Sequence, residues 1–237
     1  MNALTIGYAV IGGVLPALIW LYFLLKEDSR CPEPKGMIAS AFVVGMLAVA
    51  VVLPFEEWTK AAAGGQMNAV LLSWAAIEEV AKYAMAAAFI LWRRAVDEPT
   101  DYVIYMITVA LGFAAAENAL FLLSPVASGS VAASVATDDL RFLGSTLLHV
   151  VASASVGFAL AAAAMHRPHH RVAAVSIGLI LAIALHLLFN VLIINAGNTP
   201  ALTAFFLVWT LAVVFFAALE VLKYFEYRNL PNDTCPT

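Results

Sequence analysis

Six ionisable residues interrupt long apolar stretches of this 237-residue chain. They are Glu78, Glu79, Lys82, Glu117, His149 and His186. An ionisable group at the centre of a bilayer costs about 2.5–3.5 kcal/mol on insertion scales, and it usually faces a protein interior or a water-filled cavity where it has a function. These six residues are therefore the first candidates for chemistry.

The spacings around these residues predict contacts between polar groups. In Glu78-Glu79-Val-Ala-Lys82 the lysine is one helical turn from both carboxylates, so it can neutralise one and leave the other available as a base. Asn190 follows His186 by four residues, which places an amide on the same helix face. Two histidines and a spare carboxylate could bind zinc with a fourth position open for water, while another glutamate takes the proton of that water.

The composition predicts that these residues lie in a membrane. Hydrophobic residues make up 63% of the chain and charged residues 12%, whereas a soluble domain is about a quarter charged. Residues 172–219 contain no Asp, Glu, Lys or Arg and are long enough to cross a bilayer twice. We therefore predict an all-α polytopic membrane protein with a single domain over residues 1–237. The net charge of -4 leaves no basic surface for nucleic acid.

Seven transmembrane helices are expected, separated by charged or turn-rich breaks such as the Ser/Gly/Ala-rich residues 124–139. They are predicted at residues 3–25, 36–54, 68–92, 102–124, 142–165, 172–194 and 200–219. One set of alternate loops carries nine Lys and Arg residues, and the other carries only Lys60 and Arg141. Because positive loops stay in the cytoplasm, the N-terminus is expected outside and a short tail, residues 225–237, in the cytoplasm.

Helix rise places the polar residues at similar depths. Glu78, Glu117, His149 and His186 lie about seven to ten residues from the outer ends of their predicted helices, or about 10–15 Å at 1.5 Å per residue. A lone histidine or a Glu–Lys pair can serve helix packing alone, but four helices with ionisable groups at one depth favour a functional site. Glu56 and Glu57, by contrast, are predicted at the outer interface.

Four short motifs occur in order, each in the middle of a predicted helix. They are Glu78-Glu79-x-x-Lys82, Gly112-Phe113-x-x-x-Glu117-Asn118, His149 and His186-x-x-x-Asn190. Together they resemble the PrsW family of bacterial intramembrane proteases, which is related to the CAAX prenyl endopeptidases and Abi proteins. That wider group has FxxxH where this chain has Phe113-x-x-x-Glu117, a carboxylate that PrsW-like members share.

The resemblance implies hydrolysis of a peptide bond in a single-pass membrane protein, near the outer boundary of the bacterial cytoplasmic membrane. PrsW itself acts on an anti-sigma factor, so a substrate of that kind is one expectation. By analogy with the wider group, Glu78 is expected to deprotonate the attacking water, and Glu79 with Lys82 to orient and tune it.

The same resemblance leaves the use of a metal open. Glu117, His149 and His186 either bind a zinc ion that carries the water or, without metal, supply proton transfer and charge stabilisation. Asn190 is expected to be a partner of His186 or an oxyanion donor.

Three other functions remain as alternatives. Buried Glu, His and Lys also build the sites of ion- or proton-coupled transporters, but paired broken helices and an internal repeat, which would favour a transporter, are not evident. A CAAX-type prenyl-protein endopeptidase is disfavoured by the carboxylate at Glu117. A non-catalytic scaffold for membrane helices is disfavoured by the complete set of four motifs.

Overall fold

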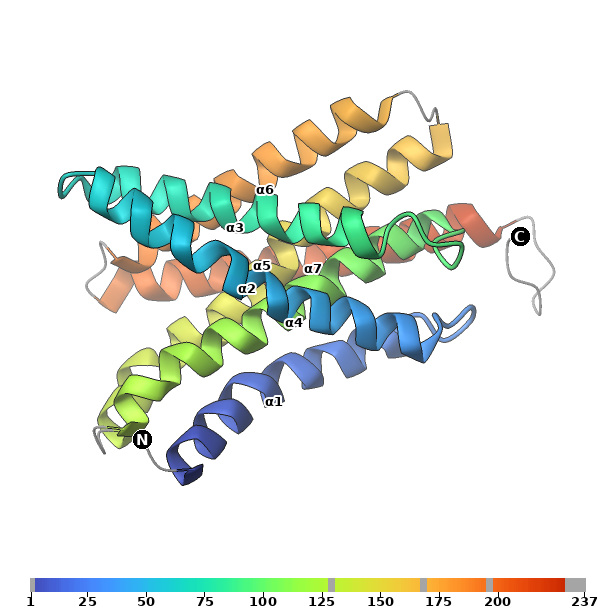
Figure 1. Ribbon diagram of the computed structural model, residues 1–237. Coiled ribbons are helices and arrows are strands. Elements are labelled where there is room, and N and C mark those ends of the chain that lie inside the picture. The colour runs from blue at the N-terminus through green and yellow to red at the C-terminus, as the bar shows by residue number, and fades with distance from the viewer. Residues whose placement is uncertain (1–2, 128–130, 167–169, 195–197, 229–237) are drawn as a thin grey trace.

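The computed structural model describes residues 3–127, 131–166, 170–194 and 198–228, and over these ranges the chain forms seven α-helices and no strand. The helices are α1 (Ala3–Glu27), α2 (Lys35–Ala62), α3 (Met67–Phe89), α4 (Pro99–Ala127), α5 (Val131–His166), α6 (Arg171–Ile194) and α7 (Asn198–Tyr227). They run back and forth, so α1 begins and α7 ends at opposite ends of the bundle (Figure 1). The predicted all-α fold is confirmed for the described residues.

Six helices in the described part of the chain are long and apolar enough to cross a membrane: α1, α2, α4, α5, α6 and α7. The remaining helix, α3, has 23 residues but carries Glu78, Glu79 and Lys82 at its centre. Large apolar side chains such as Val172 and Ile180 point outward from the bundle, where lipid tails would meet them. The number of membrane crossings and the orientation of the termini stay predictions.

Several helices extend beyond the apolar runs that predicted them. Helix α2 continues past Pro54 to Ala62, and α7 continues to Tyr227. Helix α5 begins at Val131, so most of the expected break at residues 124–139 is helical, and residues 128–130 lie outside the described part. A charged or small polar residue ends an apolar run, but its helix propensity differs little from that of many apolar residues. A helix can therefore continue through it, which explains these differences. The predicted tail, residues 225–237, starts inside α7, and residues 229–237 are not described.

Helix α4 forms the centre of the bundle. Nearly all of its residues from Tyr102 to Ala115 are buried, and it packs against α1, α2 and α5. A Cβ added to Gly112 would lie 1.9 Å from the backbone oxygen of Phe42, and one added to Gly45 would lie 1.9 Å from that of Val109. Small residues at both positions therefore allow α2 and α4 to cross in backbone contact.

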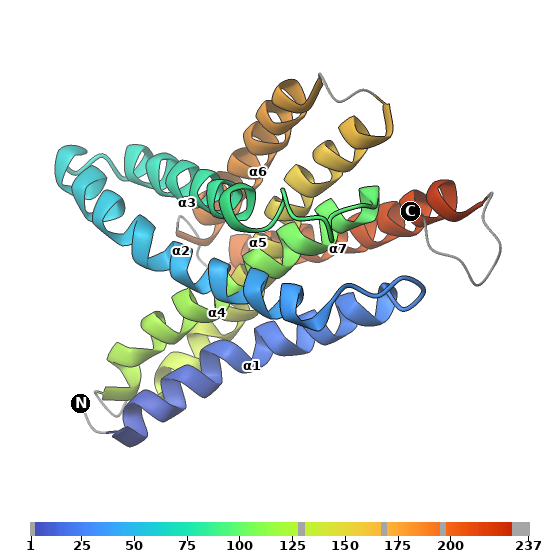
Figure 2. The same cartoon turned by 45° about the vertical axis from the view of Figure 1, so that its right-hand side comes forward.

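The helices diverge on one side of this crossing. Helices α2 and α3 lie side by side and separate from α1 and α4 toward the end of the bundle where α1 begins, as both views show (Figure 1, Figure 2). The space next to the crossing is filled by an apolar cluster that includes Val49 and Val52 of α2, Phe113 of α4 and Ile77 of α3. One turn beyond Phe113 on α4 comes Glu117.

Candidate active site

The six ionisable residues singled out in the sequence meet where α3, α4, α5 and α6 converge. They are Glu78, Glu79 and Lys82 from α3, Glu117 from α4, His149 from α5 and His186 from α6. Glu117 has a side chain that is 41% exposed, and the other five are buried. The structure thus brings the residues predicted at one depth together in one cluster, in which only the Glu117 side chain is partly exposed.

Lys82 is the cation at the centre of this cluster. Its Nζ donates to Oε1 of Glu79 at 2.6 Å and lies 3.8 Å from Oε2 of Glu78, because residues three and four apart share a helix face. The ammonium also lies 4.5 Å from the ring centre of Phe113. Lys82 is fully buried, and these neighbours hold it in one position.

Glu79 connects the lysine to the histidine on α6. The same Oε1 that binds Lys82 contacts Nδ1 of His186 at 2.8 Å. A carboxylate on one ring nitrogen fixes the orientation of an imidazole and raises the basicity of the other nitrogen. Nε2 of His186 consequently faces Glu78, with 3.9 Å between this nitrogen and Oε2.

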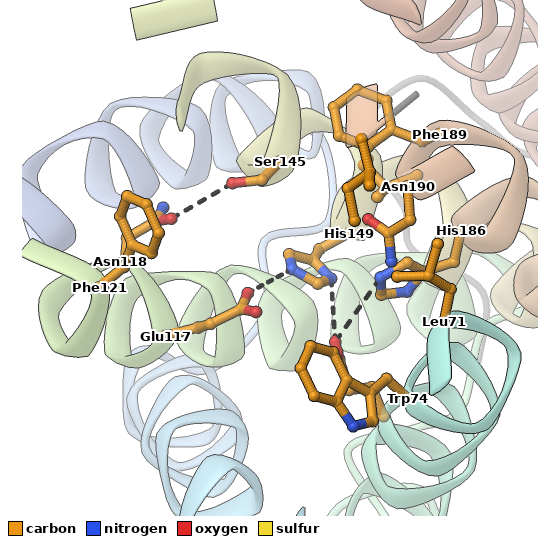
Figure 3. A pocket seen from close by; sticks show the side chains of 13 residues that line it. Leu71, Trp74, Glu117, Asn118, Phe121, Ser145, His149, His186, Phe189 and Asn190 are labelled. Carbon is orange, nitrogen blue, oxygen red and sulfur yellow. Dashed lines mark hydrogen bonds and ion pairs between the residues drawn. The ribbon is translucent and has the colours of Figure 1, made fainter. Parts of the chain in front are cut away.

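His149 is held from both sides. Its Nδ1 lies 2.8 Å from Nζ of Lys82, and its Nε2 lies 2.7 Å from Oε2 of Glu117. An ammonium group only donates hydrogen bonds, so Nδ1 accepts and Nε2 carries the proton that it donates to Glu117. Figure 3 shows Glu117 pointing toward His149, which stands beside His186.

Glu78 differs from Glu79 because one of its buried carboxyl oxygens is not used in a hydrogen bond within the cluster. Its Oε2 is buried and accepts no hydrogen bond from the residues that the structure describes. This oxygen lies 4.0 Å from Nδ1 of His149 and 3.9 Å from Nε2 of His186. Glu78, His149 and His186 each offer one ligand atom, and these atoms lie within 4.8 Å of one another, a spacing that suits a metal ion.

A small cavity of about 120 Å³ adjoins the cluster. Glu78, Glu117, His149 and His186 form part of its wall, and Asn190, the residue predicted to support His186, also lines it (Figure 3). The apolar part of the wall consists of Leu71, Trp74, Leu148, Phe121, Phe189 and Ile194. The cavity can therefore hold water or a small part of a substrate next to the polar groups.

Two supporting contacts were not evident in the sequence. Asn118 donates to Oγ1 of Thr146 at 2.9 Å and accepts from Oγ of Ser145 at 3.2 Å, which ties α4 to α5 beside the Glu117–His149 pair. Glu56 lies close enough to the cluster for the charges of Glu117 and Lys82 to act on its carboxyl group. The sequence does not indicate this position, because the apolar run predicts a helix that ends at residue 54. The helix continues past Pro54, and this brings Glu56 near the cluster.

A bundle of apolar helices enclosing a buried Glu, His and Lys cluster defines a polytopic membrane protein with an internal acid–base site. Residues 33–219 match the family described as PrsW family intramembrane metalloprotease, and the chain belongs to this family. It is therefore a multi-pass protein of the bacterial cell membrane. All four predicted motifs lie within the matched residues.

Two curated relatives carry the name Protease PrsW. The protein from Geobacillus kaustophilus (strain HTA426) is 34% identical over 116 residues, which cover 47% of this chain and 51% of the relative. The protein from Bacillus subtilis (strain 168) is 28% identical over 120 residues, which cover 49% of this chain and 55% of the relative. The chain thus spans about half the length of the curated relatives it matches. No solved structure matches it.

Proposed function

We propose that this protein is an intramembrane endopeptidase that hydrolyses a peptide bond of a single-pass membrane protein near the outer membrane boundary. The observation that carries the proposal is the buried Oε2 of Glu78, which accepts no hydrogen bond from the described residues and faces two histidines beside a cavity. The family resemblance adds the finer proposal that the substrate is an anti-sigma factor.

In this proposal Glu78 accepts the proton of the attacking water. Lys82 and Glu79 act as one unit, because Lys82 balances the carboxylate charge while Glu79 orients His186. Glu117 orients His149 in the same way. Asn190 lines the cavity and is the proposed donor to the oxygen that becomes negatively charged as the peptide carbonyl is attacked.

The donor set also fits the metal that the family description implies. His149 and His186 are ligands in either arrangement, and binding of His149 would replace one of its contacts with Lys82 and Glu117. The carboxylate ligand is Glu78, favoured by the converging atoms, or Glu117, favoured by the sequence. The carboxylate that does not bind the ion would then be the proton acceptor. A zinc ion held there would supply an acidified water and charge stabilisation at the carbonyl oxygen.

Elemental analysis of the purified protein tests the metal arrangement. We expect stoichiometric zinc in the wild type and its loss in His186→Ala, while His170→Ala, outside the cluster, retains it. An active wild type that contains no metal would leave the histidines as acid–base and charge-stabilising groups only.

The proteolytic function itself is tested with a single-pass reporter protein reconstituted with the enzyme in liposomes. The wild type is expected to cut the reporter once near the outer boundary, and Glu78→Gln to remove the cut. Wild-type protein that leaves every single-pass reporter intact would argue against a protease and revive the transporter alternative.

A further inference from the structure

A second cavity, of about 440 Å³, lies at the end of the bundle where α3 ends and α6 begins. Toward this end α5 and α6 diverge from α3 and α4, as both views show (Figure 1, Figure 2). Its volume falls in the range of about 300–1,000 Å³ that is usual for small-molecule sites. The described residues that line it include none of the six in the candidate active site, so the two cavities are separate.

The wall of this second cavity is mostly apolar and aromatic. Its aromatic residues are Tyr83, Trp92 and Tyr102, and its apolar residues are Ala87, Leu91, Leu160, Val172 and Val175. Val172 is 80% exposed and Trp92 is 67% exposed, so the cavity opens on the outer surface of the bundle. Tyr and Trp gather where the hydrocarbon core of a membrane meets the lipid head groups, and we expect the cavity at that depth.

Arg171 is the charged residue among those described in the wall. Its Nη2 donates to the hydroxyl of Tyr102, and its guanidinium carbon lies 5.4 Å from the centre of the Tyr102 ring. Tyr102 is buried on α4, so the arginine is anchored to the core of the bundle. A guanidinium has five N–H donors and the bond to Tyr102 uses one, which leaves donors that can bind a phosphate in a fork.

A second arginine adjoins the rim of the cavity. The guanidinium carbon of Arg93 lies 5.2 Å from the ring centre of Trp92, which lines the cavity. The described part of the wall contains neither Asp nor Glu. The cavity therefore combines an apolar wall with a positively charged rim.

We propose that this cavity binds one anionic phospholipid, with the phosphate at Arg171 and the acyl chains along Leu91, Val172 and Val175. Basic pockets between transmembrane helices on the cytoplasmic side bind anionic lipid head groups, and this end of the bundle is the one expected in the cytoplasm. The apolar wall, open to the side of the bundle, suits acyl chains, which a soluble phosphate lacks. The proposal does not depend on the proteolytic function.

A lipid in this cavity would contact both α3 and α6. Glu79 and His186 connect the same two helices inside the bundle. Because a ligand that binds only the folded state stabilises it, phosphatidylglycerol should raise the unfolding temperature of the wild type more than phosphatidylcholine does.

Native mass spectrometry of the full chain in detergent measures the binding directly. The probes are phosphatidylglycerol and phosphatidylcholine with identical acyl chains. We expect one phosphatidylglycerol per chain, bound at least about fivefold more tightly than phosphatidylcholine. Arg171→Gln should weaken phosphatidylglycerol binding about fivefold, the usual contribution of one basic residue to the attraction of anionic lipid.

Arg228→Gln is the matched control for Arg171→Gln. The guanidinium carbon of Arg228 also lies over an aromatic ring, 5.2 Å from the ring centre of Phe225, but neither residue lines the cavity. This variant should bind phosphatidylglycerol as the wild type does. Equal binding of the two lipids by the wild type, or equal losses in Arg171→Gln and Arg228→Gln, would overturn the proposal.

Ser176→Trp tests the apolar space apart from the charge. Ser176 is exposed and lines the cavity, so an indole there fills the space for the acyl chains and leaves Arg171 in place. We expect it to lose the bound phosphatidylglycerol and to unfold at the wild-type temperature in lipid-free detergent. Wild-type lipid binding by Ser176→Trp would overturn the proposal.

Two further outcomes of the same experiment would assign the cavity to another occupant. Displacement of phosphatidylglycerol by an equal concentration of sn-glycerol 3-phosphate would show that the phosphate alone is bound. A dimer of the wild type that disappears in Ser176→Trp would show that a second copy of the chain fills the cavity. Either result would contradict a lipid site.

Discussion

Buried and half-buried carboxyl groups gather at two places in the described part of this molecule, and they have different neighbours. The first group, here called the catalytic cluster after its proposed role, combines Glu78, Glu79 and Glu117 with Lys82 and two histidines. The second group, here called the acidic cluster, lies at the end of the bundle where α1 and α7 end and α2 and α4 begin (Figure 1). It consists of Asp28, Glu33, Glu98, Asp101 and Glu226.

Hydroxyl groups take the place of cations in the acidic cluster. Tyr105 donates to Glu33, Thr100 to Glu226 and Tyr227 to Glu98. Lys223 forms ion pairs with Glu27 and Glu220, and its charge also acts on Asp28. The hydroxyl donors themselves carry no positive charge.

The protonation of the acidic cluster reflects these neighbours. Burial raises the pKa of Asp28 to about 7 and that of Glu98 to about 7, and burial together with the adjacent Asp101 raises the pKa of Glu33 to about 9. Near neutral pH Glu33 therefore holds its proton, and Asp28 and Glu98 are partly protonated. Both groups are largely removed from solvent, so their counter-charges, rather than burial, distinguish the cluster with the proposed base from the acidic cluster.

The largest effect is expected from removing the cation of the catalytic cluster. Lys82→Met leaves Glu79 buried without its ion-pair partner, which typically costs about 3–5 kcal/mol of stability, and it should also remove most cleavage activity. Thermal unfolding in detergent and reporter cleavage measure the two losses.

The double variant Glu79→Gln/Lys82→Met is the control for this experiment. It should recover part of the stability, because no uncompensated charge remains, but not the activity, because His186 then lacks its carboxylate partner. An unfolding temperature of Lys82→Met equal to that of the wild type would show that the two clusters do not differ in their need for a cation.

The pH dependence of stability should come from the acidic cluster. Because its carboxyl groups have a higher pKa in the folded protein than in the unfolded chain, the folded state binds their protons more tightly, and stability is greatest at acid pH. It should fall most steeply from about pH 4 to about 7, where Asp28 and Glu98 keep their protons only in the folded protein, and more gently from there to about 9, the pKa of Glu33. Unfolding temperatures between pH 5 and pH 9.5 measure this decline.

Glu33→Gln tests whether Glu33 causes the decline of stability at alkaline pH. An amide cannot ionise, so the decline between about pH 7 and 9 should flatten, with a gain in unfolding temperature of about 2–4 °C at the alkaline end, the shift that about 1 kcal/mol gives a chain of this size. A decline that is as steep in Glu33→Gln as in the wild type would remove Glu33 from the explanation.

The smallest effect is expected from Tyr105→Phe. It deletes the hydroxyl that donates to Glu33 and should lower stability by about 1 kcal/mol, with cleavage unchanged. Denaturant unfolding and reporter cleavage check both statements. A strong loss of cleavage would mean that the acidic cluster is coupled to the catalytic one and is more than a structural group.

Much of the catalytic cluster could be predicted from the sequence, and the acidic cluster could not. Helix rise is constant, so residue counts gave the depths of Glu78, Glu117 and His186, and apolar runs gave the helices that carry them. Which ring nitrogen meets which carboxylate depends on the rotation of each helix, and this is set by tertiary packing such as the α2–α4 crossing at Gly112.

The acidic cluster escaped notice for a different reason. Its members lie at helix ends and in connections, where charged residues are usually solvated, and they are far apart in the chain, from Asp28 to Glu226. Only the fold shows that the hydroxyl groups of Tyr105 and Tyr227 donate hydrogen bonds to Glu33 and Glu98. Glu56 is hidden in a similar way, because the apolar run predicts a helix that ends at residue 54, whereas α2 continues to Ala62.

The central claim is that the catalytic cluster, and not the acidic one, cleaves a membrane protein. The most direct measurement is the cleavage rate of a single-pass reporter in liposomes by wild type, Glu78→Gln and Glu33→Gln. We predict a loss of about 100- to 10,000-fold for Glu78→Gln, the range for removal of a general base, and a rate within about twofold of wild type for Glu33→Gln. Full cleavage by Glu78→Gln would contradict the account.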